Sequence, residues 1–566
     1  MIEQQAAGRS TWWLALIGLI LILAGAYYAN RVQTDGGITV QDIRFAGTGG
    51  TEMSALLYIP KNATAVAPAP GILAVHGYIN SRETQDGFAI EFARRGYVVL
   101  ALDQTGHGYS GGAAFSNGFG GPDGLAYLRS LPMVDKAQIG LEGHSMGGWT
   151  ILAAAAAMPN DYQSMVLEGS STGKPFAKEG DPQWPRNLML VFSQYDEFSK
   201  IMWDVDRAKD VASSAKLQSV FGTKAKISEG QLYGSIEGGT ARILHQPATT
   251  HPGDHLSNDA IGHATDWFAK TLKGGTPRAA SDQIWFGKEV GTGIGLIGLL
   301  MVILGVFDGL LRTPLFAGLR QSAKPGFIRR DAQWWRRFGL SAGVPTLLFF
   351  PVFIALYLLV PPSAVIPQLV TTQVTVWALL GAGVTWLIGR GSAEAASDWV
   401  RSLGIATLTV AVGYVLLFAV DRLFHTDLRF WIVAIKFPSA RQWWIAAIYV
   451  VPLTIAFLVT VKALCNQTVR GDTMITRYGA AILSLSGGFL LVFGAVYAGF
   501  FATGYLVTSF DPLSTVIALQ FIPVLAAIAI IGIFTWSRTG SHRAGALLIG
   551  MLVTLYVVAG TATQVA

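Results

Sequence analysis

Nine apolar runs restrict the architectures open to this chain more than any other feature of its sequence. The first covers residues 11–29, TWWLALIGLILILAGAYYA. The other eight lie near residues 289–311, 338–360, 369–389, 402–420, 442–463, 478–507, 514–536 and 544–563. A helix needs about 20 apolar residues to cross a bilayer. The pattern therefore predicts an integral membrane protein with about nine helical spans.

The composition divides the chain into three parts. Only 13% of the residues are charged and the mean hydropathy is +0.44, whereas soluble domains carry about 25% charged residues. Residues 31–280 nevertheless have the composition of an ordinary soluble domain. We therefore expect an N-terminal transmembrane anchor at 1–30, a soluble domain at 31–280 and a multispan helical domain at 281–566.

The first apolar run has two interpretations, an uncleaved anchor or a cleaved signal peptide. The run is long, and Tyr27 and Tyr28 at its end are typical of the interfacial aromatic belt of a membrane helix. These two features favour the anchor.

Basic residues in the loops orient the spans. The segment 312–337 holds seven Lys and Arg residues and one acid, Asp331, so the positive-inside rule makes it cytoplasmic. The Arg-bearing loops 390–401, 464–477 and 537–543 then also lie inside. The N-terminus is predicted to be cytoplasmic and the soluble domain extracytoplasmic. The loop 421–441 is an exception, because it falls outside and still carries four basic residues: Arg422, Arg429, Lys436 and Arg441.

The net charge of +6 arises from these membrane loops, so we expect no nucleic-acid partner. Cys465 is the one cysteine, which rules out an internal disulfide and a site built from several cysteines.

Residues 38–275 alternate short β-branched runs with helical runs. ITVQDIRF and ALLYIP are typical of an opening hairpin, and GILAVHG, YVVLALD, IGLEGHS, SMVLEGS and LMLVFSQYD read as buried parallel strands. Helical patterns lie at 84–95, 121–131, 147–158 and 257–272, and a long insertion at 199–240 has a helical pattern at 204–220. Strand-helix alternation predicts an α/β doubly wound, mostly parallel sheet, with its ligands at the carboxyl ends of the strands.

The stretch Gly143-His144-Ser145-Met146-Gly147 has the form G-x-S-x-G between a strand and an Ala-rich helix. This is the context of a nucleophile elbow, where the turn is so tight that the neighbours of the serine must be glycine. The pattern predicts Ser145 as a nucleophile.

With these motifs the chain resembles the α/β-hydrolase family, in its serine-aminopeptidase-like and esterase-like branch. The resemblance covers about residues 38–275 and includes VHGY at 75–78 and the D-x-x-G-x-G-x-S loop within residues 81–112. It implies an oxyanion hole from the backbone N–H groups of Tyr78 and Met146. It also implies a triad in the chain order serine, acid, histidine, with Asp196, beside Glu197, as the acid.

Three histidines are candidates for the catalytic base: His251, His255 and His263. His255 is favoured because it precedes Ser257, an expected N-cap for the last helix, and His251 is the alternative. His263 falls inside that helix. A metal site at His251 and His255 is disfavoured because Pro252-Gly253 interrupts the helix that an i, i+4 pair needs. We expect neither a metal nor a cofactor.

The sequence thus predicts a membrane-bound serine hydrolase, carboxylesterase-like or lipase-like, whose Ser145, His255 and Asp196 act through an acyl-enzyme. The substrate class is a carboxylic ester, including acyl lipids. One alternative is a peptidase or amidase with the same triad. A second is a non-catalytic sensor or transport scaffold. Either the 199–240 insertion or the ends of the spans are expected to roof the site.

Overall fold

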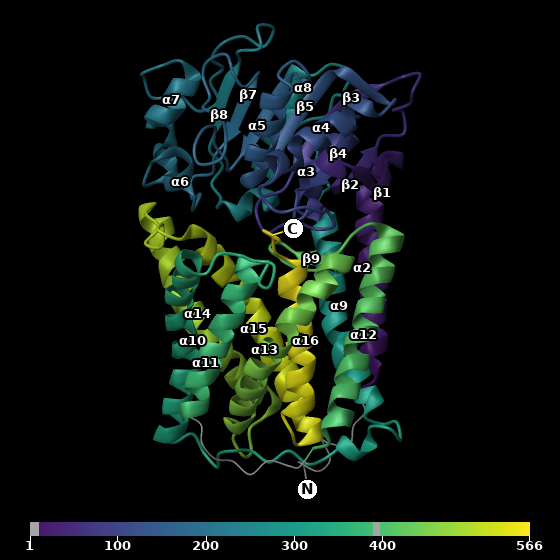
Figure 1. Cartoon of the computed structure of the whole chain (residues 1–566), viewed down its shortest axis with the longest axis vertical. Coiled ribbons are helices and arrows are strands. Elements are labelled where there is room, and N and C mark those ends of the chain that lie inside the picture. Colours follow the sequence, from purple (N-terminus) through teal and green to yellow (C-terminus); the bar gives the residue numbers. More distant parts are fainter. Residues whose placement is uncertain (1–10, 389–396, 566) are drawn as a thin grey trace.

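The computed structural model describes residues 11–388 and 397–565. Arg9, Arg390 and the rest of the expected inner loop up to residue 396 lie outside the described residues. The molecule has two stacked layers (Figure 1). We call residues 39–272 the α/β region, and helix α2 together with residues 286–565 the helical region.

A single eight-stranded sheet organises the α/β region. The strand order is β1-β2-β4-β3-β5-β6-β7-β8. β1 pairs antiparallel with β2, β2 pairs antiparallel with β4, and all the later pairs are parallel. The strands are β1 (Thr39–Ala46), β2 (Glu52–Ile59), β3 (Ala69–Val75), β4 (Val98–Asp103), β5 (Val134–His144), β6 (Ser164–Glu168), β7 (Leu188–Val191) and β8 (Arg242–His245). The opening hairpin and the parallel strands predicted from the apolar runs are confirmed.

Helices cover both faces of the sheet, as expected of a doubly wound fold. The four main ones are α3 (Asp86–Arg94), α4 (Gly121–Ser130), α5 (Met146–Ala157) and α8 (Asn258–Thr271). One buried cluster includes apolar residues of α4 and α5, and a second includes those of α3 and α8. Ser257 caps α8 by accepting from the N–H of Ala260, so that prediction is confirmed.

The helix predicted over 204–220 is wrong. The insertion instead forms α6 (Ser199–Trp203), a 3-10 turn (Ala208–Ser213) and α7 (Ala215–Phe221). The physical reason lies at two backbone positions. Asp204 adopts a left-handed conformation that ends α6, and Ser214 is extended just before α7.

The helical region is a bundle whose helices run roughly along the direction in which the two layers are stacked (Figure 1). Within the described residues, eight helices are long and apolar enough to cross a membrane. They are α2 (Trp13–Gln33), α9 (Phe286–Leu310), α10 (Ala332–Leu359), α11 (Leu369–Ile388), α12 (Trp399–Phe424), α13 (Ala440–Asn466), α14 (Met474–Thr503) and α15 (Pro512–Thr539). The ninth expected span is the shorter α16 (Arg543–Ala559), of 17 residues.

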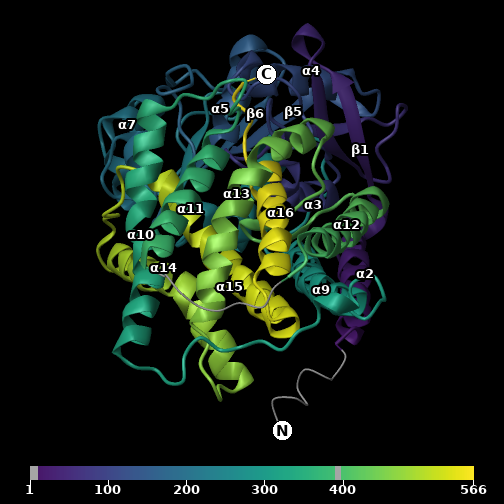
Figure 2. The same cartoon turned by 60° about the horizontal axis from the view of Figure 1, so that its bottom comes forward.

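Helix α16 lies within the bundle beside α13 and α15 (Figure 2). Its last turn ends next to the α/β region, whereas α2 begins at the opposite end of the bundle (Figure 1). The start of α2 and the end of α16 therefore lie on opposite sides of the helical layer. Of the nine expected spans, eight are long enough to cross a membrane within the described residues.

Glycines bring α2 and α9 into backbone contact. A Cβ built on Gly18 would lie 2.5 Å from the carbonyl oxygen of Gly298, and one on Gly25 would lie 2.3 Å from that of Gly291. The reciprocal positions are equally tight, since a Cβ on Gly298 would lie 2.6 Å from the carbonyl oxygen of Gly18. Small residues allow this close approach of membrane helices. The first apolar run thus packs as an integral part of the bundle.

The basic loop that broke the charge pattern contacts the α/β region. It carries a short hairpin, β9 (Leu428–Phe430) and β10 (Val433–Ile435). Arg429 pairs with Asp427 at 2.6 Å and donates to the hydroxyl of Thr84 at 2.9 Å. Arg441 donates to the carbonyl oxygen of Gly112 at 2.6 Å. These cations are held by protein partners, which explains their place in a predicted outer loop.

Candidate active site

The nucleophile elbow has the strained geometry that its sequence predicts. Ser145 lies between β5 and α5 with φ 55° and ψ −121°, a conformation that non-glycine residues seldom adopt. Its neighbours have no room for a side chain. A Cβ on Gly143 would lie 2.4 Å from the carbonyl oxygen of Gly147, and a Cβ on Gly147 would lie 2.1 Å from that of Val75.

Asp196 binds His251. The carboxylate Oδ2 lies 2.8 Å from His251 Nδ1, and both residues are buried. Asp196 follows β7 and His251 follows β8, so the carboxyl ends of two neighbouring strands bring them together. A proton on Nδ1 that is donated to Asp196 leaves Nε2 as the basic nitrogen. The structure therefore pairs the predicted acid with the alternative histidine.

His255 does not reach Asp196. Both of its ring nitrogens are buried without a hydrogen-bond partner in the described residues, and its ring lies 4.1 Å from that of His144. The physical reason is local, because residues 252–256 form a 3-10 turn. This turn directs His255 toward α3 and Phe88, with ring centroids 6.4 Å apart. His263 stacks on His245 at 3.7 Å, away from the pair.

Three contacts connect the Asp196–His251 pair to the elbow. The N–H of Ser145 donates to the carbonyl oxygen of Glu168 at 2.8 Å. The next residue, Gly169, lies against the pair, since a Cβ built on it would fall 2.8 Å from His251 Nδ1. His144, the residue before the nucleophile, has its Nε2 2.9 Å from the carbonyl oxygen of His251. Ser145, Asp196 and His251 are thus gathered at one edge of the sheet.

Burial sets the protonation state of the base. It lowers the pKa of His251 to about 3, because the charged imidazolium loses solvation in the interior. The imidazole is therefore neutral near pH 7, which is the form that accepts a proton.

The predicted oxyanion residues flank the nucleophile. Tyr78 follows β3, and Met146 is the first residue of α5. The preceding Gly77 lies against Ser145, because a Cβ on Gly77 would fall 3.1 Å from the serine Cβ. Ile79, with φ 56°, packs on the apolar core of the helical region. The loop beside the nucleophile is therefore in contact with the bundle.

An aromatic surface adjoins the same loop. Tyr78 lies 5.7 Å from Phe115 between ring centroids, Phe115 lies 5.6 Å from Phe176, and Phe176 lies 5.0 Å from Trp149 on α5. Phe115 and Phe176 are 41% and 50% exposed. Phe115 and Phe119 both have positive φ. Strained backbone thus presents apolar rings next to the elbow helix.

Helical-region segments also hold the site loops. Gln564 donates to the hydroxyl of Tyr78 at 2.6 Å, and Trp431 of the hairpin donates through Nε1 to the carbonyl oxygen of Pro252 at 2.8 Å. The helical region therefore contacts the loops that follow β3 and β8. Sequence reasoning offered no signal for these contacts beyond the unusual charge of the 421–441 loop.

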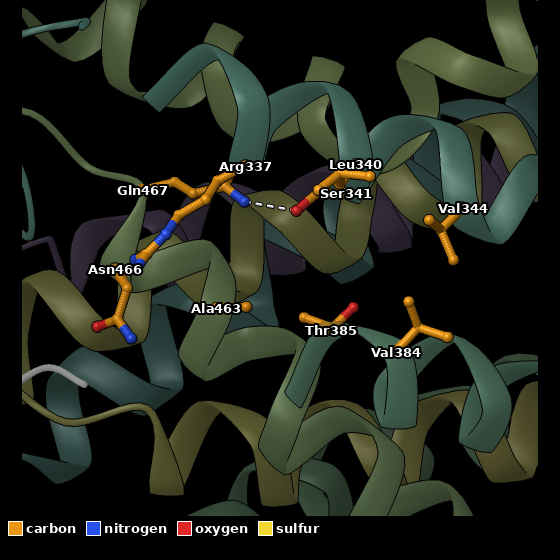
Figure 3. Close-up of a pocket in the computed structure, with 9 residues that line it drawn as sticks. All are labelled: Arg337, Leu340, Ser341, Val344, Val384, Thr385, Ala463, Asn466 and Gln467. Atoms are coloured by element: carbon orange, nitrogen blue, oxygen red, sulfur yellow. Dashed lines mark hydrogen bonds between the residues drawn. The ribbon is translucent and has the colours of Figure 1, made fainter. Parts of the chain in front are cut away.

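Two adjoining cavities lie elsewhere, the first among α10, α11 and α13 (Figure 3). The second is lined by these helices and by α14, α15 and α16. Their empty volumes are about 400 and 720 Å³, and they share Ser341, Thr385 and Ala463. Gln467 at the rim donates to Ser341 at 2.5 Å. All of the lining residues belong to the helical region. These cavities are therefore separate from the Ser145 site.

Comparison with known proteins finds similarity in the α/β region. Residues 67–195 match the family model described as serine aminopeptidase, S33. A monoacylglycerol lipase from Mycolicibacterium smegmatis is 32% identical over 133 residues, which are 22% of this chain and 45% of that protein. The chain thus matches less than half the length of this relative.

Solved structures similar to the α/β region include two enzymes. An esterase from Pyrococcus furiosus is 14% identical with a TM-score of 0.32, and the match covers 42% of this chain and 94% of that one. An S-formylglutathione hydrolase from Agrobacterium tumefaciens is 15% identical with a TM-score of 0.31, covering 42% and 97%.

The sheet topology and the family match confirm the predicted fold class. The chain combines an α/β-hydrolase fold with an all-α region of long apolar helices. Its α/β region resembles the serine-aminopeptidase-like branch of the α/β-hydrolase family.

Proposed function

We propose that the protein is a membrane-bound serine hydrolase of carboxylic esters, with a triad of Ser145, His251 and Asp196. The observation that carries the proposal is the buried contact of His251 with Asp196 beside a strained Ser145 elbow. We assign the soluble hydrolase domain to residues 31–280, between an anchor at 1–30 and a multispan domain at 281–566.

The proposed reaction gives each of these groups one role. His251 Nε2 takes the hydroxyl proton of Ser145 as Oγ attacks the ester carbonyl carbon. The oxyanion is stabilised by the backbone N–H groups of Tyr78 and Met146. His251 then gives the proton to the departing alcohol. Water, deprotonated by the same nitrogen, attacks the acyl-enzyme and releases the acid and free Ser145.

The aromatic surface favours an apolar acyl group in the substrate. Phe115 and Phe176 are exposed beside the elbow helix, and burying such rings against an alkyl chain is favourable by about 25 cal/mol per Å² of apolar area. The relative that is a monoacylglycerol lipase supports an acyl-lipid ester as the substrate class.

The test is a chain-length series of p-nitrophenyl esters, from acetyl to palmitoyl, with detergent-purified wild type and Ser145→Ala. We expect hydrolysis that favours longer acyl chains and is lost in the variant. Activity that is equal in the two proteins would refute the triad.

A second candidate is a peptidase or amidase, which the description of the matching family favours. Aminoacyl-naphthylamides assayed beside the esters separate the two. Cleavage of the amides without cleavage of any ester would replace our proposal by this one.

We further propose that the hydrolase domain faces the extracytoplasmic side and that the N-terminus is cytoplasmic. Val66 is 96% exposed on the α/β region, and Cys465 is buried. In intact cells, Val66→Cys is expected to react with a membrane-impermeant maleimide while wild type does not. Labelling of the variant only after cell lysis would reverse the orientation.

A further inference from the structure

A side chain of the helical region reaches the loop that carries the triad acid. Tyr497, near the end of α14, places its hydroxyl 2.8 Å from Glu197 Oε1. The other oxygen of Glu197, Oε2, accepts the backbone N–H of His251 at 2.8 Å. Glu197 is only 2% exposed. One buried carboxyl thus joins a membrane helix to the catalytic base.

Aromatic contacts strengthen this junction. Tyr195, two residues before Glu197, lies 5.9 Å from Phe500 and 5.1 Å from Phe501 between ring centroids. Tyr195 also packs against the buried cluster of Tyr497, Phe500 and Leu506. The 195–197 segment is therefore seated on the end of α14 by apolar surface as well as by a hydrogen bond.

The contacts to His251 show what Glu197 does. The imidazole Nδ1 is held by Asp196, the carbonyl oxygen by His144, and the N–H by Glu197. All three partners belong to the α/β region, but Glu197 is itself bound by Tyr497 of the helical region. Removing the Glu197 contact leaves the backbone N–H of His251 without this partner, while the ring stays paired with Asp196.

We propose that Tyr497 is a positioning residue that acts through Glu197 to fix His251, so that the helical region completes the active site. The inference rests on the proposed triad. A base must lie within hydrogen-bond reach of the serine proton, and a misplacement of about 1 Å can cost about 10²-fold in rate. Tyr497 supplies that precision without touching the substrate.

The protonation state of Glu197 sharpens the test. Burial and the neighbouring Asp196 raise the pKa of Glu197 to about 8, so it is a neutral acid near pH 7. Glutamine is a close mimic of that form, because its Oε1 can accept from the N–H of His251 while its Nε2 donates to the hydroxyl oxygen of Tyr497. Leucine has a similar size and neither capacity.

The experiment compares Tyr497→Phe, Glu197→Gln and Glu197→Leu in the full chain. The matched control is Tyr414→Phe on α12, whose hydroxyl is buried without a hydrogen-bond partner in the part of the chain that is described. We expect Y497F to lower kcat about 10- to 100-fold with KM within about twofold. Y414F should stay within about twofold of wild type in both constants.

The two Glu197 variants test whether Tyr497 acts on His251 through the Glu197 carboxyl. E197L should lose at least as much kcat as Y497F, and E197Q should recover most of it. The double variant E197L/Y497F should be no slower than E197L, because Tyr497 acts on His251 only through Glu197. None of these substitutions changes Trp431, which binds Pro252, so we expect the two regions to stay docked. Fully additive losses would overturn the proposed route.

A fluorophosphonate probe keeps this inference distinct from the proposed function. The reaction of this probe with Ser145 requires a correctly placed His251, but it does not require that the protein cleaves esters. Wild type that is labelled but cleaves no ester would refute the ester assignment and leave the labelling rates of the same variants as the test. Y497F labelled as fast as wild type would overturn the role of Tyr497. Wild type that is not labelled at Ser145 would overturn both.

Discussion

The α/β region and the helical region contribute to the proposed site in opposite ways. Every group assigned to the reaction, from Ser145 to His251, lies on the α/β region within a few residues of a strand end. The helical region contributes no reacting group to that assignment. It contributes contacts to the loops around those groups, through Tyr497, Trp431 and Gln564. In our proposal the α/β region thus supplies the reacting groups, and the helical region supplies contacts that hold them in position.

The largest effect expected is the loss of the nucleophile. Ser145→Ala should lower kcat for the best ester by at least about 10³-fold, because removing a triad serine leaves only binding and oxyanion stabilisation. The measurement is steady-state hydrolysis in detergent, with circular dichroism to show that the fold is retained. Loss of less than about tenfold would place the chemistry outside the elbow.

The two histidines of the 251–255 segment sharpen the assignment within the α/β region. His251→Ala should lower kcat by about 10³-fold, since it removes the base. His255→Leu should change kcat by less than about fivefold, because His255 is packed beside His144 and Phe88 without a hydrogen bond in the described residues. The reverse order of effects would restore His255 as the base.

In the helical region we expect a substitution to lower stability through overpacking. Gly298→Ala puts a methyl group 2.6 Å from the carbonyl oxygen of Gly18, an overpacking that costs about 1–3 kcal/mol. Gly383→Ala on α11 meets nothing within 4 Å and serves as the matched control. We expect a lower melting temperature in detergent for G298A alone. Equal melting temperatures would show that the α2–α9 contact is loose.

The smallest effect expected is a pH dependence of stability in the α/β region. Burial raises the pKa of Glu142 to about 8, from 4.5 in an unfolded chain. Between these values the folded form keeps a proton that the unfolded form releases, so stability falls as pH rises toward 8. Glu142→Gln should flatten the fall of melting temperature between pH 6.5 and 8.5. An unchanged slope would mean that other groups cause it.

Local patterns predicted much of this molecule. The elbow was readable because G-x-S-x-G sits between a strand and a helix, and both end where the sequence indicates. The long apolar runs likewise became long helices. Such features depend on residues within about ten positions of each other.

The base was harder to predict because three histidines follow one strand. The capping argument identified Ser257 correctly, but it says nothing about the 3-10 turn at 252–256 that turns His255 away. The contact of Tyr497 with Glu197 joins residues 300 positions apart. No local pattern encodes such a pair, since it exists only once the sheet edge is placed on the bundle.

The glycine contact between α2 and α9 also affects how the protein is made. The two helices are neighbours in the bundle, but residues 34–285 separate them in the chain. At about 5–20 residues per second, a ribosome needs roughly 13 to 50 seconds to synthesise that interval. During this time the glycine face of α2 has no α9 to pack against. The whole α/β region must therefore be delivered across, or held aside, before the first helix pair of the bundle can close.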